Sequence, residues 1–562
     1  MALPKVDAVI IGLGAAGGVM AKELATAGMK VVGLDLGPFR HTSDFVYHDE
    51  LRMEVRQELL RPKLTETPMQ WRIDANSPAY PFVPWTISVG VGGGSVHYGT
   101  WMWRMLPHHF KIYSDTVSKY GTGALPAGSN IVDWPITYND LAPYYDKVDS
   151  EIGVSGKAGN IGGIVQTGGN PFEGPRSGDY KLPPLLQATS SRMFAQAATA
   201  MNFKVFPTPS GIISQNYNGR PACNYCGFCS SYGCHVGAKS STLVTVIPVA
   251  VATGNLEIRT SCRVIKINND GTKATSVTYI DQDGVQQEQP ASLIVLSSFT
   301  WEVVRLLLMS NINRSGLVGK YFMAHAYNIT TGFFDNTITN VSPGAGGGVN
   351  TIDEFNGDNF DHTGLGFIEG ASITSLGGGT HGIGGANNVP PGTPTWGDAY
   401  KAAVKKYFNR NSGLIAQLPA MPYDANYLDL DPNVKDALGL PVIRITYKAY
   451  DNEIKAGTYL QTKQTDLLKQ MGATATVLGT YNFPPATNHE VGGARMGTDP
   501  AKSVVDQNLE SWELPNMFVV SGAVFPTYFG YNPTNTIEAL SFRAGDYITT
   551  QVKTGGALAK YM

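Results

Sequence analysis

The sequence predicts an α/β protein that begins with a Rossmann-like unit, and two observations near the N-terminus support this prediction. VDAVIIG, from residue 6, reads as a short buried strand, and AAGGVMAKELATAGM has helical spacing. Between them, Gly12, Gly14 and Gly17 satisfy G-x-G-x-x-G in the order strand, turn, helix. A tight turn in an alanine-rich helix is the plainer alternative, but the flanking strand and helix favour dinucleotide binding.

A second apolar strand, KVVGLDLG, provides the other observation. It places Asp35 near its end, about where an acidic side chain accepts hydrogen bonds from a ribose. The N-terminus of the intervening helix would hold a pyrophosphate against its unpaired N–H groups. The motif alone does not separate NAD from FAD.

The composition is that of a large globular enzyme. The chain has 562 residues, of which 43% are hydrophobic and 15% charged, and its net charge is only −3, so we expect no nucleic-acid partner. No apolar run reaches the roughly 18 residues that span a bilayer, and only MALPK precedes the first strand. We therefore expect no transmembrane segment and no export signal in this chain, which leaves the compartment open.

A glycine-rich segment, TISVGVGGGSVHYGTWMWR, follows the N-terminal unit. Its small residues, among them Gly93, Gly94 and Ser95, would let the backbone approach a flat ligand. His97 comes just after them, and it is either an ordinary hydrogen-bonded side chain or a residue that faces a cofactor ring.

Four of the five cysteines lie in one block, GRPACNYCGFCSSYGCHVGAKSS. Cys223, Cys226, Cys229 and Cys234 have the spacing C-x2-C-x2-C-x4-C, which favours an iron–sulfur cluster over the paired knuckles of most zinc sites. A zinc site or a disulfide staple is the alternative. Ser231 stands where a haem-binding C-x-x-C-H would need cysteine, so any haem must sit on another polypeptide.

Three C-terminal segments reveal a family resemblance. They are ATNHEVGGARMGTDP, the apolar strand NMFVVSGAVFP, and GYNPTNTIEALSFRAGDYI, a loop that runs into a helix. Their order resembles that of the glucose–methanol–choline (GMC) oxidoreductases, which implies an FAD cofactor. By that resemblance His489 is a catalytic histidine, Asn532 is its partner, and Ala523 lies in the segment whose backbone flanks the flavin.

The resemblance is closest to the flavoprotein large subunits of gluconate 2-dehydrogenase and related membrane-linked sugar dehydrogenases. They share the PxCNxCGxCxxxxC block, a YNDLAPYYDKVD-like helix and a YLDLDP segment. In that branch a small subunit with an export signal carries the large subunit into the periplasm, and a cytochrome c subunit takes the electrons. The resemblance thus implies both partners and a periplasmic, membrane-associated location.

The chemistry of alcohol oxidation assigns roles to these residues. A neutral His489 can take the hydroxyl proton while hydride leaves for flavin N5, and Asn532 can hold the substrate oxygen; the plainer alternatives are a structural contact for His489 and a turn residue for Asn532. Relatives such as pyranose oxidase attach FAD through a histidine in a segment like that around His97, so we expect a covalent link there, with a noncovalent contact as the alternative. Arg495 either pairs with a substrate carboxylate or braces its loop.

The function implied is oxidation of a secondary hydroxyl of a sugar or sugar acid, as in gluconate 2-dehydrogenase. Related sugar dehydrogenases hold a three-iron cluster with three cysteines, so [3Fe-4S] is favoured over [4Fe-4S]. Such a cluster would split a two-electron hydride for a one-electron cytochrome, which favours a dehydrogenase. A glucoside 3-dehydrogenase, or a sugar oxidase that reduces oxygen, is the alternative.

The resemblance also implies the domain organisation. Residues 1–320 would form a discontinuous FAD-binding domain that includes the cysteine loop near 221–240, with Val264 at the adenine. Residues 321–480 would form an inserted substrate-binding domain built on an antiparallel sheet, which includes the strand-like ANYLDLDP and LPVIRITYKAY. Residues 481–562 would return to the FAD-binding domain with the catalytic histidine and asparagine.

Overall fold

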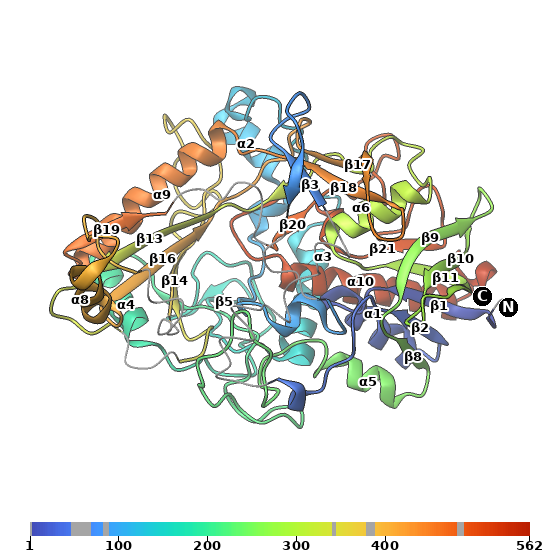
Figure 1. The fold of residues 1–562 in the computed structure, drawn as a ribbon, viewed down its shortest axis with the longest axis horizontal. Helices are drawn as coiled ribbons and strands as arrows, with labels where there is room; N and C mark the ends of the chain where they lie inside the picture. The colour runs from blue at the N-terminus through green and yellow to red at the C-terminus, as the bar shows by residue number, and fades with distance from the viewer. Residues whose placement is uncertain (1–2, 46–68, 83–88, 340–343, 378–387, 480–487) are drawn as a thin grey trace.

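The computed structural model describes residues 3–45, 69–82, 89–339, 344–377, 388–479 and 488–562. The strand before the N-terminal glycine turn belongs to a seven-stranded sheet (Figure 1). Its order is β8-β2-β1-β11-β10-β9, with β21 also paired to β11. The strands are β1 (Val6–Ile11), β2 (Val31–Leu34), β8 (Leu256–Arg259), β9 (Arg263–Asn269), β10 (Ala274–Ile280), β11 (Gln286–Leu296) and β21 (Met517–Val519).

Strand β11 is long enough to join the two halves of this sheet. Its first half pairs antiparallel with β10, and its second half runs parallel to β1 and β21. Strands β1, β2 and β8 are also mutually parallel, as the predicted Rossmann-like unit requires. Helices α1 (Ala15–Thr26), α3 (Tyr138–Val148), α5 (Val246–Ala252) and α10 (Thr534–Lys553) pack together beside the sheet.

A second sheet, at the left in Figure 1, is six-stranded and antiparallel throughout. Its order is β19 (Ala475–Leu478), β13 (Tyr327–Phe333), β16 (Asn411–Gln417), β15 (Ile373–Ser375), β14 (Asn350–Ile352) and β7 (Phe206–Pro207). Helices α4 (Thr189–Ala200) and α9 (Asp451–Gln470) pack against it. The expected inserted domain on an antiparallel sheet is confirmed, and the sheet also takes β7 from an earlier part of the chain.

The two strand-like segments of the YLDLDP region do not join this sheet. They form β17 (Tyr427–Lys435) and β18 (Pro441–Thr446), which build a four-stranded sheet with β3 (Met69–Arg72) and β4 (Tyr80–Phe82). Helix α6 (Thr300–Met309) packs between this sheet and β9. Two short ladders are β5 (Asn160–Ile161) with β6 (Ile164–Val165), and β12 (Met323–Ala324) with β20 (Glu490–Val491); the remaining α-helices are α2 (Ile112–Tyr120) and α8 (Gly397–Tyr407).

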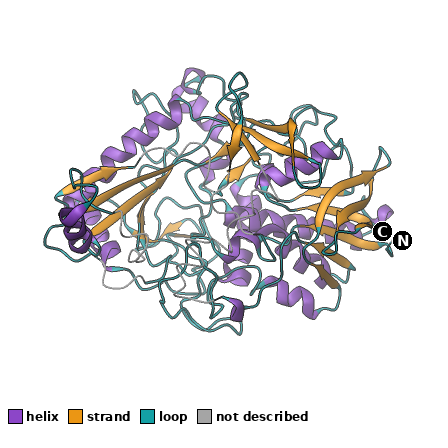
Figure 2. Ribbon diagram, in the orientation of Figure 1, coloured by secondary structure: helices purple, strands orange, loops and turns teal. Residues whose placement is uncertain are grey.

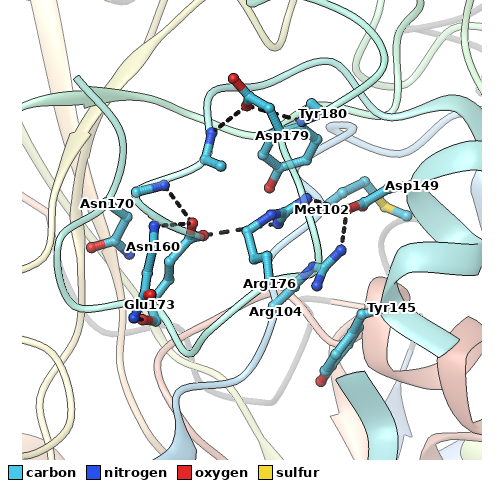
Figure 3. Close-up of polar contacts among 12 residues, drawn as sticks. Met102, Arg104, Tyr145, Asp149, Asn160, Asn170, Glu173, Arg176, Asp179 and Tyr180 are labelled. Atoms are coloured by element: carbon cyan, nitrogen blue, oxygen red, sulfur yellow. Dashed lines mark hydrogen bonds and ion pairs between the residues drawn. The ribbon is translucent and has the colours of Figure 1, made fainter. Parts of the chain in front are cut away.

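Much of the chain between α3 and α5 is loop, as the teal segments of Figure 2 show. A buried ion network anchors part of it (Figure 3). Asp149 accepts hydrogen bonds from both Arg104 and Arg176, and the Arg176 guanidinium lies 3.8 Å above the Tyr180 ring. Glu173 accepts from the backbone N–H of Asn160 at 3.1 Å. The network therefore ties the loop after α3 to the segment that follows the glycine run.

Among the helices that the structure describes, none is long and apolar enough to cross a membrane.

Candidate active site

The glycine turn after β1 forms one wall of a cavity of about 490 Å³, which Gly12 and Gly14 line. Gly12 has a φ of +89°, which favours glycine. A Cβ on Gly17 would stand 1.8 Å from the carbonyl oxygen of Gly12, so Gly17 permits the close approach of α1 to the strand and does not itself line the cavity. A Cβ on Gly93 would stand 2.8 Å from the Cα of Gly14, which means that the two glycine segments meet backbone to backbone.

Asp35 and Val264 also line the cavity. Asp35 is buried, and its carboxylate accepts hydrogen bonds of 2.9 Å from the backbone N–H groups of Leu13 and Gly37. Burial raises its pKa, whereas these two hydrogen bonds and the nearby Arg40 oppose the rise. Each carboxylate oxygen keeps a second lone pair, so the predicted bond to a ribose hydroxyl remains chemically possible.

The glycine-rich segment supplies another part of the wall through Gly93, Gly94, Ser95 and His97. His97 is 5% exposed, and its Nε2 atom has no hydrogen-bond partner among the residues that the structure describes. Burial, and secondarily the positive charge of Lys239, lowers its pKa to about 3. The ring of His97, which lines the cavity, is thus neutral and carries an unpaired buried nitrogen. Together with the glycine cradle, this orphaned atom fits a cofactor held in the cavity.

His489, the predicted catalytic histidine, lies just before β20 and also lines the cavity. Its Nε2 atom is 3.1 Å from Nδ2 of Asn532, so the structure brings the two predicted catalytic residues together. Burial lowers the pKa of His489 to about 3, which keeps the imidazole neutral. Ser521 and Gly522 of the intervening segment line the cavity, and Ala523 is the next residue along.

Two donors fix the orientation of the Asn532 amide. Trp103 Nε1 donates to Asn532 Oδ1 at 3.1 Å, and Gln417 Nε2 donates to the same oxygen at 2.8 Å. Because an indole nitrogen can only donate, its partner must be the amide oxygen. The amide nitrogen of Asn532 therefore points to His489 Nε2 and donates to it.

Two further residues contact the other side of the His489 ring. His325 Nδ1 lies 3.3 Å from His489 Nδ1, and the Tyr327 hydroxyl lies 3.4 Å from the same atom. His325, Tyr327 and Gln417 could not be singled out from the sequence, because no local motif surrounds them. The only signal was one histidine within the apolar run YFMAHAY, in a chain with ten histidines.

Arg495 braces its loop. Its Nε donates to the carbonyl of Lys502 at 2.9 Å, its Nη1 donates to Asn130 Oδ1 at 3.0 Å, and its guanidinium lies 3.9 Å above the Tyr321 ring. Of the two roles that the sequence left open, the structure supports the brace.

The cysteine loop borders the same cavity. Ser230 and Ser231 line it, and the Ser231 N–H donates to the carbonyl of His97 at 2.8 Å. The four cysteines are free thiols, so the loop contains no disulfide staple. Burial raises the pKa of Cys223 to about 12 and also raises that of Cys226.

These thiols do not converge on a metal site as they stand. No group of three or more His, Cys, Asp or Glu side chains that could hold a metal ion occurs in the described ranges. Local packing separates them: Cys229 belongs to one small apolar cluster, and Cys234 packs against another. Cys223 packs against both clusters. The residues in this arrangement do not fit a cluster, and we derive no step through one.

A Rossmann-like sheet, a glycine-cradled cavity and a histidine–asparagine pair at its edge define an oxidoreductase with an FAD-binding fold. The comparisons agree, and the chain belongs to the GMC oxidoreductase family. Two family profiles, both described as GMC oxidoreductase, match residues 184–327 and 422–541.

Relatives of known activity match the chain over nearly its whole length. It is 36% identical to the gluconate 2-dehydrogenase flavoprotein of Pantoea cypripedii, over 99% of this chain and 96% of the relative. It is 30% identical to the 2-methyl-1,2-propanediol dehydrogenase of Mycolicibacterium austroafricanum, over 97% and 95%. It is 26% identical to the fructose dehydrogenase large subunit of Gluconobacter japonicus, over 98% of both chains.

Solved structures support the fold. A formate oxidase matches with a TM-score of 0.64 at 15% identity, over 99% of this chain and 100% of that one. Pyridoxine 4-oxidase from "Mesorbium loti" matches with a TM-score of 0.61 at 16% identity, over 97% and 99%.

Proposed function

We propose that this chain is an FAD-dependent dehydrogenase that oxidises a secondary hydroxyl of a sugar or sugar acid. The observation that carries the proposal is the pairing of His489 Nε2 with Asn532 Nδ2 at 3.1 Å, at the edge of the cavity that the glycine turn lines. The gluconate 2-dehydrogenase flavoprotein and the fructose dehydrogenase large subunit, both similar over nearly the whole chain, support the substrate class.

The two residues divide the work on the substrate hydroxyl. When the substrate binds, the Asn532 Nδ2–H group that bonds His489 Nε2 in this structure donates to the substrate oxygen instead, and the Nε2 lone pair that it releases takes the hydroxyl proton. FAD held in the cavity would supply the acceptor for the hydride from the carbon that carries this hydroxyl. The alcohol would then lose one proton and one hydride and become a carbonyl. Trp103 and Gln417 keep the amide nitrogen of Asn532 on the histidine side throughout.

The first test is an anaerobic titration of the purified flavoprotein with D-gluconate, D-fructose and a methyl glucoside. We expect one of them to bleach the visible flavin bands. His489→Gln should slow this bleaching by roughly 10²- to 10⁴-fold, the usual contribution of a general base. If none of these substrates nor a simple polyol bleaches the wild-type flavin, the proposed substrate class is wrong.

A sugar oxidase is the second candidate. Paromamine 6'-oxidase of Streptomyces fradiae, at 28% identity over 97% of this chain and 92% of the relative, favours it. An oxidase would release hydrogen peroxide in stoichiometric amounts during aerobic turnover, whereas the dehydrogenase that we propose would need an added acceptor.

We propose further that His97 forms a covalent bond to a methyl carbon of the flavin, which loses a C–H bond as the N–C bond forms; the two electrons of that C–H bond would reduce the flavin, and the electron acceptor of turnover would reoxidise it. The unpaired, buried Nε2 atom on the cavity wall supports this proposal. Acid-precipitated wild-type protein should remain yellow, and precipitated His97→Ala protein should be colourless. Release of all colour from the wild-type protein would leave only a noncovalent contact.

We keep the iron–sulfur cluster as a separate proposal, supported by the cysteine spacing and by Lys239. This lysine is 2% exposed, and burial lowers its pKa, whereas the neighbouring Cys229, Cys234, Cys226 and Cys223 oppose that shift. A buried cation beside four thiols suits an anionic thiolate site. Iron and acid-labile sulfide analysis of the purified protein tests it, and protein without iron would remove the cluster.

The partners, the location and the domain boundaries are also proposed. The similar large subunit of fructose dehydrogenase supports a multi-subunit assembly, and the small subunit, the cytochrome c subunit and the periplasmic location are proposed from the family resemblance. Co-purification from the native cell, with haem absorbance in the complex, tests the assembly. The division at residues 320 and 480 is supported by the separation of the seven-stranded and six-stranded sheets.

A further inference from the structure

The short ladder between β12 and β20 brings a second histidine to the catalytic one. Ala324 pairs with Glu490 in this antiparallel ladder, so the next residues outward, His325 and His489, face each other. Their Nδ1 atoms are 3.3 Å apart, and their ring centroids are 5.4 Å apart in an edge-on arrangement of 86°.

The position of the proton on His325 follows from its other contact. His325 Nε2 lies 2.7 Å from the backbone carbonyl oxygen of Phe529, which can only accept. The Nε2 atom therefore carries hydrogen. His325 is 1% exposed, and burial and the neighbouring His489 lower its pKa well below its usual value, so the ring is neutral. In a neutral imidazole with hydrogen on Nε2, the Nδ1 atom is an acceptor.

The acceptor on His325 in turn determines the proton on His489. Between two Nδ1 atoms at hydrogen-bond distance, His489 must be the donor, which leaves its Nε2 atom without hydrogen, as the hydrogen bond that Nε2 accepts from Asn532 also requires. That is the atom that faces Asn532. Tyr327 also reaches His489 Nδ1, but a hydroxyl can donate or accept and so selects neither tautomer.

We propose that His325 is a positioning residue that holds His489 in the tautomer with hydrogen on Nδ1, so that Nε2 stays the base for the substrate hydroxyl. The chain of hydrogen bonds runs from His489 Nδ1–H to His325 Nδ1 and from His325 Nε2–H to the Phe529 carbonyl. When His489 takes the substrate proton on Nε2, its Nδ1–H remains bonded to the neutral His325 ring. This inference rests on the proposed function, because it assigns the tautomer of the proposed base.

The surroundings of His325 hold its ring in the required orientation. The ring stacks on Tyr528 with centroids 3.8 Å apart and planes 3° apart. Stacking and the carbonyl bond together leave the Nδ1 atom directed at His489. An uncharged imidazole thus takes the place that a carboxylate holds in a serine-protease triad.

Two substitutions of His325 separate the effect of its Nδ1 acceptor from the effect of the ring volume. His325→Leu removes both hydrogen bonds, whereas His325→Asn keeps an oxygen near the position of Nδ1. We expect His325→Leu to lower kcat for the oxidised sugar by roughly 10- to 100-fold with less than about a threefold change in KM, and His325→Asn to recover most of the loss. FAD content and Tm identify any variant that fails to fold.

His362 provides a matched control. It is also a buried histidine whose Nε2 bonds a backbone carbonyl, that of Gly357 at 2.9 Å, and it packs on Phe360. His362→Leu should leave kcat unchanged at the same FAD content. Equal losses from His362→Leu and His325→Leu would assign the effect to general destabilisation and overturn the proposal.

The tautomer itself can be read without turnover. In protein with ring-labelled ¹⁵N-histidine, the signals of His489 are those that disappear in His489→Gln. We expect a protonated Nδ1 and an unprotonated Nε2 in the wild type and in Tyr327→Phe. In His325→Leu only the Asn532 amide still favours this tautomer, so we expect a measurable share of the other tautomer. Hydrogen on Nε2 in the wild type would overturn the proposal, whereas absence of any sugar oxidation with the expected tautomer would overturn only the proposed function.

Discussion

Gly93 shows how strongly one residue can constrain the cofactor cavity. Its φ of +51° lies in the left-handed region, and an added Cβ would stand 2.8 Å from the Cα of Gly14. We expect Gly93→Ala to push the two glycine segments apart, lower the FAD content severalfold and lower Tm by several degrees, as backbone strain of this kind costs about 1–3 kcal/mol. The FAD content of the purified protein, from absorbance, and a thermal melt measure both effects.

Gly123→Ala is the control for this substitution. Nothing lies within 4 Å of the Cβ that it would add, and its φ is not in the left-handed region. Normal FAD content in Gly93→Ala would show that the close approach of the glycine segments is not needed for binding.

Local motifs singled out residues that lie at one cavity in the structure, although the roles of these residues stay predictions. Gly12, Gly93, His97 and His489 all line the cavity, as expected. His325 and Gln417 could not be predicted in the same way. His325 meets His489 only through the register of β12 and β20, and Gln417 reaches Asn532 from the end of β16. Neither pairing leaves a pattern in the neighbouring sequence.

Among the loops and helices, the buried network around Asp149 has the clearest consequence for stability. Both arginines that bond it are at least 95% buried, as is Asp149 itself. Asp149→Asn should cost about 3–5 kcal/mol of unfolding free energy, because it leaves two buried guanidinium groups with too little negative charge. Urea unfolding followed by tryptophan fluorescence measures the change.

An exposed pair supplies the comparison. Lys119 bonds Asp358 at 3.0 Å, and its side chain is 46% exposed. Asp358→Asn should cost at most about 1 kcal/mol. Similar losses from the two substitutions would mean that burial does not set the strength of the Asp149 network.

We expect the free energy of unfolding to depend on pH through His108, which lies just before α2. Burial opposes the charging of His108, but Glu369, 2.5 Å from its Nε2 atom, and Asp115, 3.0 Å from its Nδ1 atom, raise its pKa to about 9. Because this value lies above the ordinary 6.5, the contribution of His108 is complete below pH 6.5 and is lost as the pH rises through 9. We expect the loss to be roughly 1–3 kcal/mol.

His108→Gln isolates this contribution. Unfolding free energies measured at pH 6, 7.5 and 9.5 should fall in the wild type and change less in the variant. A wild-type profile as shallow as that of His108→Gln would contradict the assignment.

Periodicity predicted the kinds of secondary structure better than their partners. The apolar segments VDAVIIG and KVVGLDLG became the parallel strands β1 and β2, and the expected inserted sheet is antiparallel. Strands β17 and β18 nevertheless pair with the distant β3. Such a pairing depends on which sheet edge is free in the folded chain, and strand patterns carry no information on that.

At the scale of the whole molecule, the cavity gathers segments from both ends of the chain. Its walls include Gly12, His97, Val264, Ser298 and His489. FAD should therefore stabilise the entire fold, by about 2.7 kcal/mol at a free concentration one hundred times its Kd. Flavin-free protein from riboflavin-limited cells should show a higher Tm when FAD is added.

FMN distinguishes the two ends of the cavity. It lacks the adenine that we expect near Val264, so it should raise Tm less than FAD does at the same concentration. Equal effects of the two flavins would place the adenine outside the cavity.

The ladder that joins β12 to β20 contains only two residue pairs. So short a ladder has little tolerance for a change on one side, because His325 and His489 depend on the same register. In related sequences, positions 325 and 489 should therefore covary. Descendants that replace one histidine should replace the other, or should regain its hydrogen bond through a new side chain at the same place.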